Sequence, residues 1–268
     1  MARPRMIDID ETIETPIQKP VQKLEGNFYE ITDIPSRFLL YPEGTKIFGR
    51  PMKVSEIKKL TTMNEVNYNS IIKSVLENCI KGIEIDELYV ADKLYLIFWL
   101  RANTYTDANF VTSYICQHCG RKTEYRFNID DFETTYLEDG FELKELKLLN
   151  RDTVLTFDFP KIKDEETIQR FIDAMKNYVV KFDDDTVTIA GMIKTIDGKE
   201  VTIKQACEFI SSLEDDPQNY ARIKSYVLGV DFGIVPELNA TCGYSDCKEV
   251  SKVPASFQPD FFIPRYKS

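Results

Sequence analysis

Two short pairs of cysteines, far apart in the sequence, constrain the fold of this chain more than any other feature. Cys116 and Cys119 are separated by two residues and are followed by Gly120, which can adopt the backbone conformation of a tight turn. Cys242 and Cys247 are separated by four residues, which is the upper end of the usual spacing for paired metal ligands. Strand-like runs flank both pairs, so each pair is predicted to lie at the tip of a β-hairpin.

If the two hairpin tips face each other, four thiolates converge and form the closed ligand set of a structural zinc site. The predicted zinc ligands are Cys116, Cys119, Cys242 and Cys247. Such a site has no open position for a substrate. The 122 residues between the two pairs must then form an insertion that returns the chain to the first hairpin. Two alternatives stay open: the thiols lie together without a metal, or the pairs form two incomplete sites.

The chain has a single histidine, His118, and it lies between the cysteines of the first pair. We expect His118 to be a surface residue of the turn, although its imidazole could replace a missing metal ligand. A Ser-His-Asp or Cys-His system would have to use this same residue, which argues against nucleophilic catalysis. The segment 191–199 lacks the spacing of a phosphate-binding loop, and the acidic run 183–185 is predicted to be a solvated turn. The sequence therefore predicts a protein that is not an enzyme.

The composition is acidic, with a formal net charge of −10 at pH 7. This charge argues against a general affinity for nucleic acid or anionic lipid. No apolar run approaches the roughly 18 to 20 residues of a membrane span, and no secretory signal is expected at the start. We therefore expect a reducing cytoplasm, where close thiol pairs bind metal more often than they form disulfides. Cys79 and Cys207 lie in helical patterns and are expected to be ordinary buried residues.

The periodicity of apolar residues predicts both helices and strands, and so an α+β fold. Helices are predicted over 55–60, 67–80, 86–100, 164–179, 204–213 and 217–229. Strands are predicted within 38–52 and over 111–116, 123–129, 153–159, 238–242 and 248–253. The segment 186–196 fits either state, because its β-branched residues favour a strand and its isoleucine spacing favours a helix. Asp86 and Asp216 are predicted to cap helices, the latter with Pro217 in the first turn.

Four parts of the chain follow from these patterns. Residues 1–33 carry three prolines and many charges without a sustained period, so an extended arm is predicted. Residues 34–130 form a helical and β part with the first cysteine hairpin, and 131–237 form a large, mainly helical insertion. Residues 238–268 form the second cysteine hairpin and an extended C-terminal tail. The predicted architecture is a zinc-ribbon-like pair of β-hairpins packed with a helical N-terminal part and the helical insertion.

A series of short motifs occurs in an order that is known from one protein family. The motifs are Ile34-Pro35-Ser36-Arg37 with Tyr41 and Gly44, a turn into a helix at 50–56, an acidic-start helix at 86–100, the cysteine hairpin at 114–120, the turn 196–198 before Phe209, and a closing cysteine hairpin with a Phe-Pro tail. Over about 34–262, the chain resembles the baseplate hub subunit and hub assembly proteins of T-even-type contractile-tailed phages. The order of the motifs is more specific than the cysteine hairpin, which many zinc proteins share.

The resemblance implies a structural or assembly protein of a viral tail, present in the host cytoplasm during assembly and retained at the baseplate of the virion. Its partners would be other baseplate and tail proteins in a hetero-oligomeric assembly, without nucleic acid or membrane. A zinc-pinned core would present the insertion and both extended termini to neighbouring subunits, with Tyr and Phe as anchors. One alternative is a zinc-ribbon nucleic-acid-binding or transcription-associated factor, which a basic surface around the cysteines would distinguish. Another is an assembly chaperone that leaves the mature particle.

Overall fold

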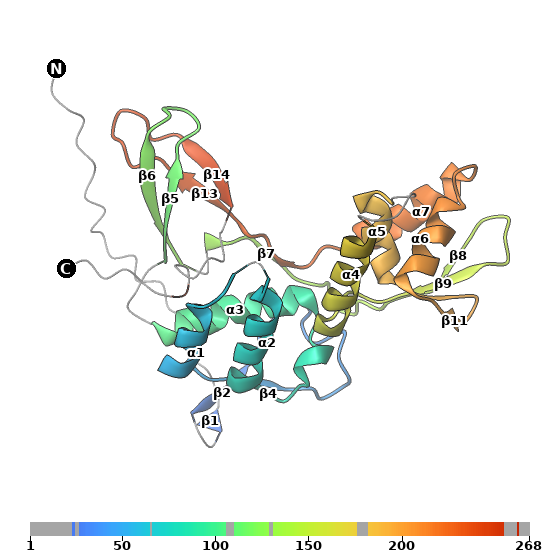
Figure 1. The fold of residues 1–268 in the computed structure, drawn as a ribbon, viewed down its shortest axis with the longest axis horizontal. Coiled ribbons are helices and arrows are strands. Elements are labelled where there is room, and N and C mark those ends of the chain that lie inside the picture. Colours follow the sequence, from blue (N-terminus) through green and yellow to red (C-terminus); the bar gives the residue numbers. More distant parts are fainter. Residues whose placement is uncertain are drawn as a thin grey trace.

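The structure is a computed structural model that describes residues 23–24, 27–64, 66–105, 110–128, 131–175, 182–254 and 262. The predicted α+β class is confirmed, because helices and several small antiparallel sheets occur together. Figure 1 shows an N-terminal lobe and a lobe built by the insertion, arranged along the long axis of the molecule. The two cysteine hairpins stand above the N-terminal lobe. The predicted arm up to residue 22 and the predicted tail, apart from Phe262, lie outside the described residues.

The N-terminal lobe combines a four-stranded antiparallel sheet with helices on a shared core. The sheet contains β1 (Lys23–Leu24), β2 (Phe28–Ile31), β3 (Ile47–Gly49) and β4 (Ile80–Lys81) in this order. The helices are α1 (Val54–Leu60), α2 (Tyr68–Cys79), the 3-10 helix η1 (Ile85–Glu87) and α3 (Val90–Thr104). The apolar stripe predicted for α2 is confirmed, because its inward residues are buried in one cluster with residues of α3. The apolar face of this amphipathic helix therefore packs it against the core of the lobe.

Two segments of this lobe differ from the sequence-based expectation. Strand β2 lies inside the segment that was expected to be an extended arm, and Phe28 and Ile31 are buried. The folded part therefore begins before residue 33. Residues 38–41, expected to be strand, form turns, and Arg37 and Phe38 have positive φ angles of 49° and 62°. This turn segment packs against the insertion, which the local sequence does not reveal.

The start of α3 also differs, because Asp86 does not cap it. Asp86 belongs to η1, and α3 begins at Val90 with Tyr89 at its N-cap. The Val90 N–H donates to the Pro160 carbonyl at 2.9 Å, and the Leu88 carbonyl accepts from the Ile162 N–H at 3.0 Å. Residues 88–90 therefore pair with a distant segment instead of continuing a helix from Asp86. Such a long-range contact overrides the local capping signal.

The insertion lobe contains a sheet as well as the predicted helices. The sheet has the order β11 (Lys199–Glu200), β10 (Ile193–Ile196), β9 (Val154–Phe157) and β8 (Leu146–Lys147), all antiparallel. The helices are α4 (Ile162–Met175), α5 (Asp184–Met192), α6 (Ile203–Ser211) and α7 (Pro217–Leu228). The ambiguous segment 186–196 is divided, with helix up to Met192 and strand after it. The predicted Asp216 cap and Pro217 start of α7 are confirmed.

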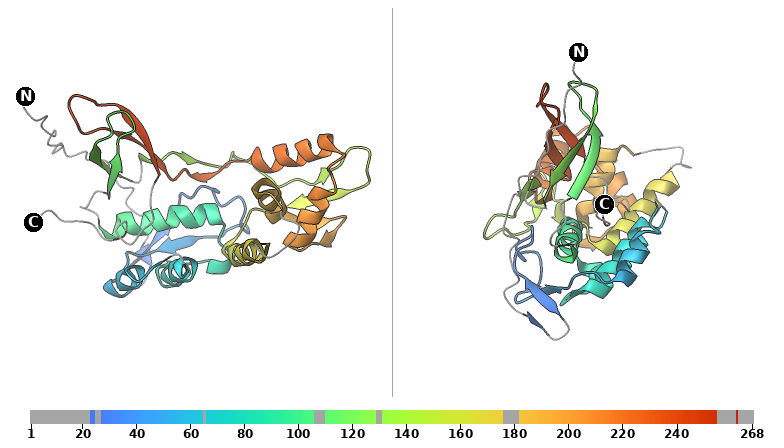
Figure 2. Two further views of the ribbon diagram at one scale, coloured as in Figure 1. Left: turned by 45° about the horizontal axis from the view of Figure 1, so that its top comes forward. Right: turned by 90° about the vertical axis from the view of Figure 1, so that its left-hand side faces the viewer.

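The two cysteine hairpins are separate two-stranded sheets that lie side by side (Figures 1 and 2). The first pairs β5 (Phe110–Ile115) with β6 (Lys122–Phe127), and the second pairs β13 (Glu237–Thr241) with β14 (Val250–Pro254). One short strand lies at each end of the insertion, β7 (Thr134–Thr135) on the way out and β12 (Gly233–Ile234) on the way back. These two strands pair antiparallel, Thr134 opposite Ile234. The insertion therefore leaves and returns at one point.

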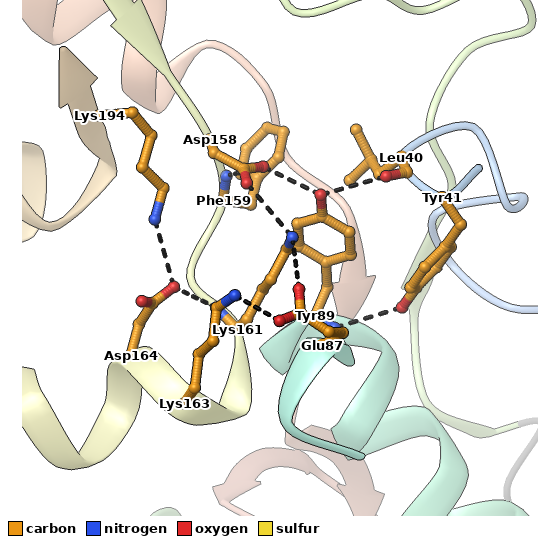
Figure 3. A network of polar contacts seen from close by, with 10 residues as sticks. All are labelled: Leu40, Tyr41, Glu87, Tyr89, Asp158, Phe159, Lys161, Lys163, Asp164 and Lys194. Carbon is orange, nitrogen blue, oxygen red and sulfur yellow. Dashed lines mark hydrogen bonds and ion pairs between the residues drawn. The ribbon is translucent and has the colours of Figure 1, made fainter. Parts of the chain in front are cut away.

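A network of ion pairs and hydrogen bonds joins the insertion lobe to the N-terminal lobe (Figure 3). The Tyr89 hydroxyl lies 3.0 Å from Asp158 Oδ1 and 3.1 Å from the Leu40 carbonyl oxygen. The Lys161 ammonium pairs with Glu87 at 3.1 Å, and Lys163 pairs with the same carboxylate. These two lysines hold the pKa of Glu87 below its ordinary value, with Lys163 as the larger cause. The contacts fix the insertion lobe against η1 and α3.

A buried carboxylate supports this joint from the N-terminal side. Asp92 on α3 is fully buried and accepts hydrogen bonds from the Ser36 N–H at 2.9 Å and the Tyr41 hydroxyl at 2.8 Å. Burial raises the pKa of Asp92, and the hydrogen bonds from Ser36 and Tyr41 oppose that shift. The Tyr41 oxygen in turn accepts from the Tyr89 N–H at 3.2 Å. The turn segment before Tyr41 is thereby held between the two lobes.

Candidate metal centre

Four cysteine sulfurs from the two hairpins converge. The ligand atoms of Cys116, Cys119, Cys242 and Cys247 all lie within 4.8 Å of one another. Across the hairpins, Sγ of Cys116 is 3.9 Å from Sγ of Cys247, and Sγ of Cys119 is 3.8 Å from Sγ of Cys242. Sulfurs bound at about 2.3 Å to a tetrahedral ion lie about 3.8 Å from one another. The spacing of the thiols therefore fits a four-thiolate metal site.

The two knuckles, residues 116–120 and 242–248, contain the same turn despite their different cysteine spacing. In the first, the Gly120 N–H donates to the Cys116 carbonyl at 2.9 Å, and in the second, the Lys248 N–H donates to the Tyr244 carbonyl at 3.1 Å. Gly120 and Lys248 each follow the second cysteine of their pair, and their φ angles are 68° and 53°. Tyr244 thus occupies the place that Cys116 has in the first knuckle.

The longer spacing of the second pair moves its first cysteine two residues back along the strand. Cys116 N–H donates to the Arg121 carbonyl at 3.0 Å, and Cys242 N–H donates to the Glu249 carbonyl at 2.9 Å, so both cysteines continue their ladders. Side chains alternate with a period of two along a strand. A shift of two residues therefore leaves the thiol of Cys242 on the same face, pointing at the other knuckle.

A small core supports the thiols on their inner side. Cys116 and Cys242 are buried together with Ala240 and Val253, and the ring of Tyr114 closes the cluster. The Tyr114 hydroxyl donates to the Ala240 carbonyl at 3.0 Å, which ties the first hairpin to the second. Cys119 and Cys247 are only half-buried. The site is therefore closed toward the hairpin cores and more open toward solvent.

The surroundings lower the pKa of two of the four thiols and raise the pKa of the other two. The backbone N–H of Cys119 is the largest cause that lowers the pKa of Cys116, and the Arg121 side chain is the largest that lowers the pKa of Cys119. Burial raises the pKa of Cys242. At Cys247 the Glu249 N–H favours the thiolate, but burial and the neighbouring thiols outweigh it and raise the pKa. Metal binding at this cluster would therefore release protons.

The other candidates from the sequence lie outside this cluster. His118 is exposed, and its Nε2 lies 3.2 Å from the Val250 carbonyl oxygen, as expected for a residue of the turn. Cys79 and Cys207 are buried, and burial raises their pKa values to about 11 and about 12. Within the described residues, the four-cysteine group is the only one of at least three metal-ligating side chains that comes together.

The acidic run 183–185 is exposed as predicted, but it is the start of a helix and not a turn, because Asp184 and Asp185 begin α5. Asp183 caps α5, because its carboxylate accepts from the Thr186 N–H at 2.9 Å and from the Thr186 hydroxyl at 2.7 Å. These hydrogen bonds hold the pKa of Asp183 below its ordinary value. Asp185 forms an ion pair with Lys224 of α7. The run therefore organises the insertion lobe.

Two buried polar residues next to the thiols were not expected from the sequence. Thr123 and Ser251 are each 2% exposed, and they sit where the strand alternation alone predicts apolar side chains. The Thr123 hydroxyl accepts from the Gly243 N–H at 3.2 Å, and the Ser251 hydroxyl accepts from the Gln117 N–H at 3.4 Å. Both contacts run from one hairpin to the other. The available signal in the sequence was a Thr or Ser at an inward position of the strand alternation, where an apolar residue is expected.

The comparison with protein families gives one match. A family model described as "T4 bacteriophage base plate protein" matches residues 35–262, which is most of the chain. The chain belongs to this baseplate family. The predicted resemblance to T-even-type baseplate proteins is thereby confirmed at the level of the family. No curated protein and no solved structure matched the chain.

Membership of the family places this baseplate protein in the virion tail and implies contacts with other baseplate proteins. It also suggests a structural rather than an enzymatic role. In the part of the chain that the structure describes, no helix has both the length and the apolar character needed to cross a bilayer.

Proposed function

We propose that this baseplate protein is a zinc-pinned scaffold of the hub region that docks neighbouring baseplate subunits. The zinc ligands are Cys116, Cys119, Cys242 and Cys247. The observation that carries this proposal is the convergence of four sulfurs at 3.8 and 3.9 Å across two hairpins that lie far apart in the sequence. A four-thiolate set with no open position suits a structural ion.

The four-cysteine zinc site, called the clasp below, would stabilise a part of the molecule that has little core of its own. Each cysteine hairpin has only two strands, and isolated two-stranded hairpins are at best marginally stable in water. In zinc-finger peptides, binding at such sites contributes about 10–16 kcal/mol to folding. A bound zinc would therefore make the hairpin pair rigid and would fix the point at which the insertion begins and ends.

The outward faces of the hairpins are candidate docking surfaces. Ile115, Val250 and Val111 are 68%, 51% and 45% exposed there. These aliphatic side chains stand on strands that the clasp holds in register. We propose that neighbouring hub subunits cover them, in a hetero-oligomeric assembly that forms in the host cytoplasm and contains neither nucleic acid nor membrane.

We further propose a division of the chain that follows its cores. The parts are an N-terminal arm, the helical and β part 34–130, the insertion 131–237 and the segment 238–268 with the second hairpin and the tail. The pairing of β7 with β12 supports the limits of the insertion. Because β1 and β2 belong to the N-terminal sheet, we extend the first part back to about residue 23.

Metal analysis of the purified full chain tests the clasp. We expect close to one zinc per chain, and the double variant C116S/C119S should lose it. His118→Gln is the matched control, because it changes the same turn without removing a sulfur, and it should keep the zinc. No zinc in the wild-type protein, or two per chain, would contradict a single shared site.

Assembly in the absence of this chain tests the docking role separately. Particles should then lack a complete baseplate, and adding wild-type protein should restore it whereas C116S/C119S should not. Purified particles should contain the chain. Its absence from mature particles would refute a retained hub subunit and support an assembly factor.

A further inference from the structure

We propose that Arg121 is a positioning residue of the four-cysteine site. Its side chain joins the two knuckles directly and holds the Cys119 thiolate in place. Arg121 directly follows the first knuckle, and its Nε lies 3.4 Å from Sγ of Cys119 in that knuckle. Its Nη2 donates to Asp246 Oδ1 of the other knuckle at 2.7 Å. The inference rests on the proposed metal site for its effect on affinity, but the link between the knuckles exists without a metal.

The guanidinium has three partners at once. Besides Cys119 and Asp246, its Cζ lies 4.0 Å from the centre of the Tyr244 ring. The Tyr244 hydroxyl donates back to the Lys122 carbonyl of the first hairpin at 3.1 Å. An isolated surface ion pair contributes little, because ordering two long side chains offsets the Coulomb attraction. Here one ordered side chain makes an ion pair, a sulfur contact and a ring contact. The entropy cost of ordering it is therefore spread over three interactions.

The place of Arg121 gives it an electrostatic effect on a bound metal. Four thiolates around a divalent ion carry a net charge of about −2. The chain as a whole is also acidic, with a formal net charge of −10 at pH 7. Arg121 is 31% exposed in its side chain and lies on the more open side of the site, next to half-buried Cys119. A fixed cation at this sulfur therefore stabilises the loaded site, and it lies against one of the two half-buried ligands.

Arginine suits this role better than lysine. Its planar fork can donate from Nε to sulfur and from Nη2 to a carboxylate in one geometry, while its face lies against an aromatic ring. A lysine ammonium is a point charge on a flexible stem and cannot make all three contacts together. Arg121→Lys should therefore keep part of the electrostatic effect and lose the link between the knuckles.

Four variants of the full chain test the proposal: Arg121→Met, Arg121→Lys, Asp246→Asn and Lys122→Met. Metal affinity is measured by competition with a chromophoric chelator. Changes of groups that hold metal ligands typically weaken affinity about 10- to 100-fold. We expect a loss in this range for Arg121→Met and smaller losses for Arg121→Lys and Asp246→Asn. Lys122→Met removes the same charge from the exposed neighbouring position and should leave the affinity within a factor of about 2, as for most surface substitutions.

Cobalt spectra give a readout that a purely structural role would not move. The Arg121 contact lowers the electron-donating power of one sulfur, so its removal should shift the thiolate-to-cobalt charge-transfer band to lower energy. Arg121→Met should show this shift and Lys122→Met should not. Equal affinities and identical spectra for Arg121→Met and wild type would overturn the electrostatic part of the proposal while leaving the zinc site itself intact.

Hydrogen exchange of the metal-free protein tests the link between the knuckles independently of the metal. In the wild type, the N–H of Gly243, which bonds Thr123 across the hairpins, should remain protected after chelation. It should lose protection in Arg121→Met. If it exchanges freely in the metal-free wild type, the link is overturned. If the wild type binds no metal at all, the proposed function fails, and this exchange measurement alone decides whether Arg121 joins the knuckles.

Discussion

The residue that follows each knuckle's second cysteine provides the sharpest test of how these turns are built. Gly120 and Lys248 hold the same position and both have positive φ, 68° and 53°. A left-handed conformation costs a residue with a Cβ about 1–2 kcal/mol and costs glycine almost nothing. Glycine should therefore be more stable than alanine at both positions, so Gly120→Ala should destabilise the protein and Lys248→Gly should be more stable than Lys248→Ala.

The expected size follows from the surroundings of Gly120. A Cβ built at Gly120 meets no atom within 4 Å, so Gly120→Ala introduces backbone strain and no clash. The strain of about 1–2 kcal/mol is partly offset by the reduced entropy of the unfolded chain, about 0.4–1 kcal/mol. The net loss should be about 1 kcal/mol. At the second knuckle, Lys248→Gly should be more stable than Lys248→Ala by a similar amount, and Lys248→Ala controls for the lost side chain.

Urea unfolding of the Co(II)-loaded protein at a fixed free metal concentration measures these differences, because the thiolate-to-cobalt absorption reports on the site itself. The order of stability should be glycine above alanine at both positions. Alanine equal to or better than glycine at both positions would refute the left-handed turns, and with them the equivalence of the two knuckles.

Three further predictions concern the rest of the molecule. Phe262 is 2% exposed between α1, α2 and α3, so Phe262→Ala should cost about 3–5 kcal/mol in urea unfolding, whereas Val66→Ala, at a side chain that is 97% exposed, should change little. Tyr89→Phe removes the hydroxyl that meets Asp158 and the Leu40 carbonyl, and it should cost about 0.5–1.5 kcal/mol and speed amide exchange at the start of α3; unchanged exchange there would contradict a rigid joint. The pKa of Glu87 is lowered on folding by Lys163 and Lys161, so its ion pairs stabilise fully above the ordinary glutamate pKa of about 4.3 and are lost as pH falls through the lower folded value. The stability difference between wild type and Glu87→Gln should therefore vanish on acidification, and a difference that persists in acid would contradict this linkage.

Sequence patterns predicted the elements whose signals are local. The stripe of α2, the Asp216–Pro217 start of α7 and the strands that flank the cysteines all depend on neighbouring residues, and the structure confirms them. The convergence of the four thiols was inferred from chemistry, because two separate pairs of metal ligands with strand flanks are complete only when they meet.

The features that were missed depend on contacts between distant segments. Residues 88–90 pair with residues 160–162, which local capping rules cannot anticipate. The contact from Arg121 to Asp246 spans 125 positions, and no spacing rule relates the two residues. The segment 186–196 fitted both periods because its residues belong to both states, and Ile193 becomes a strand residue only through pairing with Phe157.

The pairing of β7 with β12 has a consequence for how this protein can vary. Because both ends of the insertion meet where Thr135 lies opposite Gly233, the distance between them is independent of the number and arrangement of the residues in between. Residues can therefore be gained, lost or exchanged in that lobe without altering the register of the hairpins outside it. Such a chain can acquire new contact surfaces for different neighbours while the cysteine-bearing end keeps one geometry.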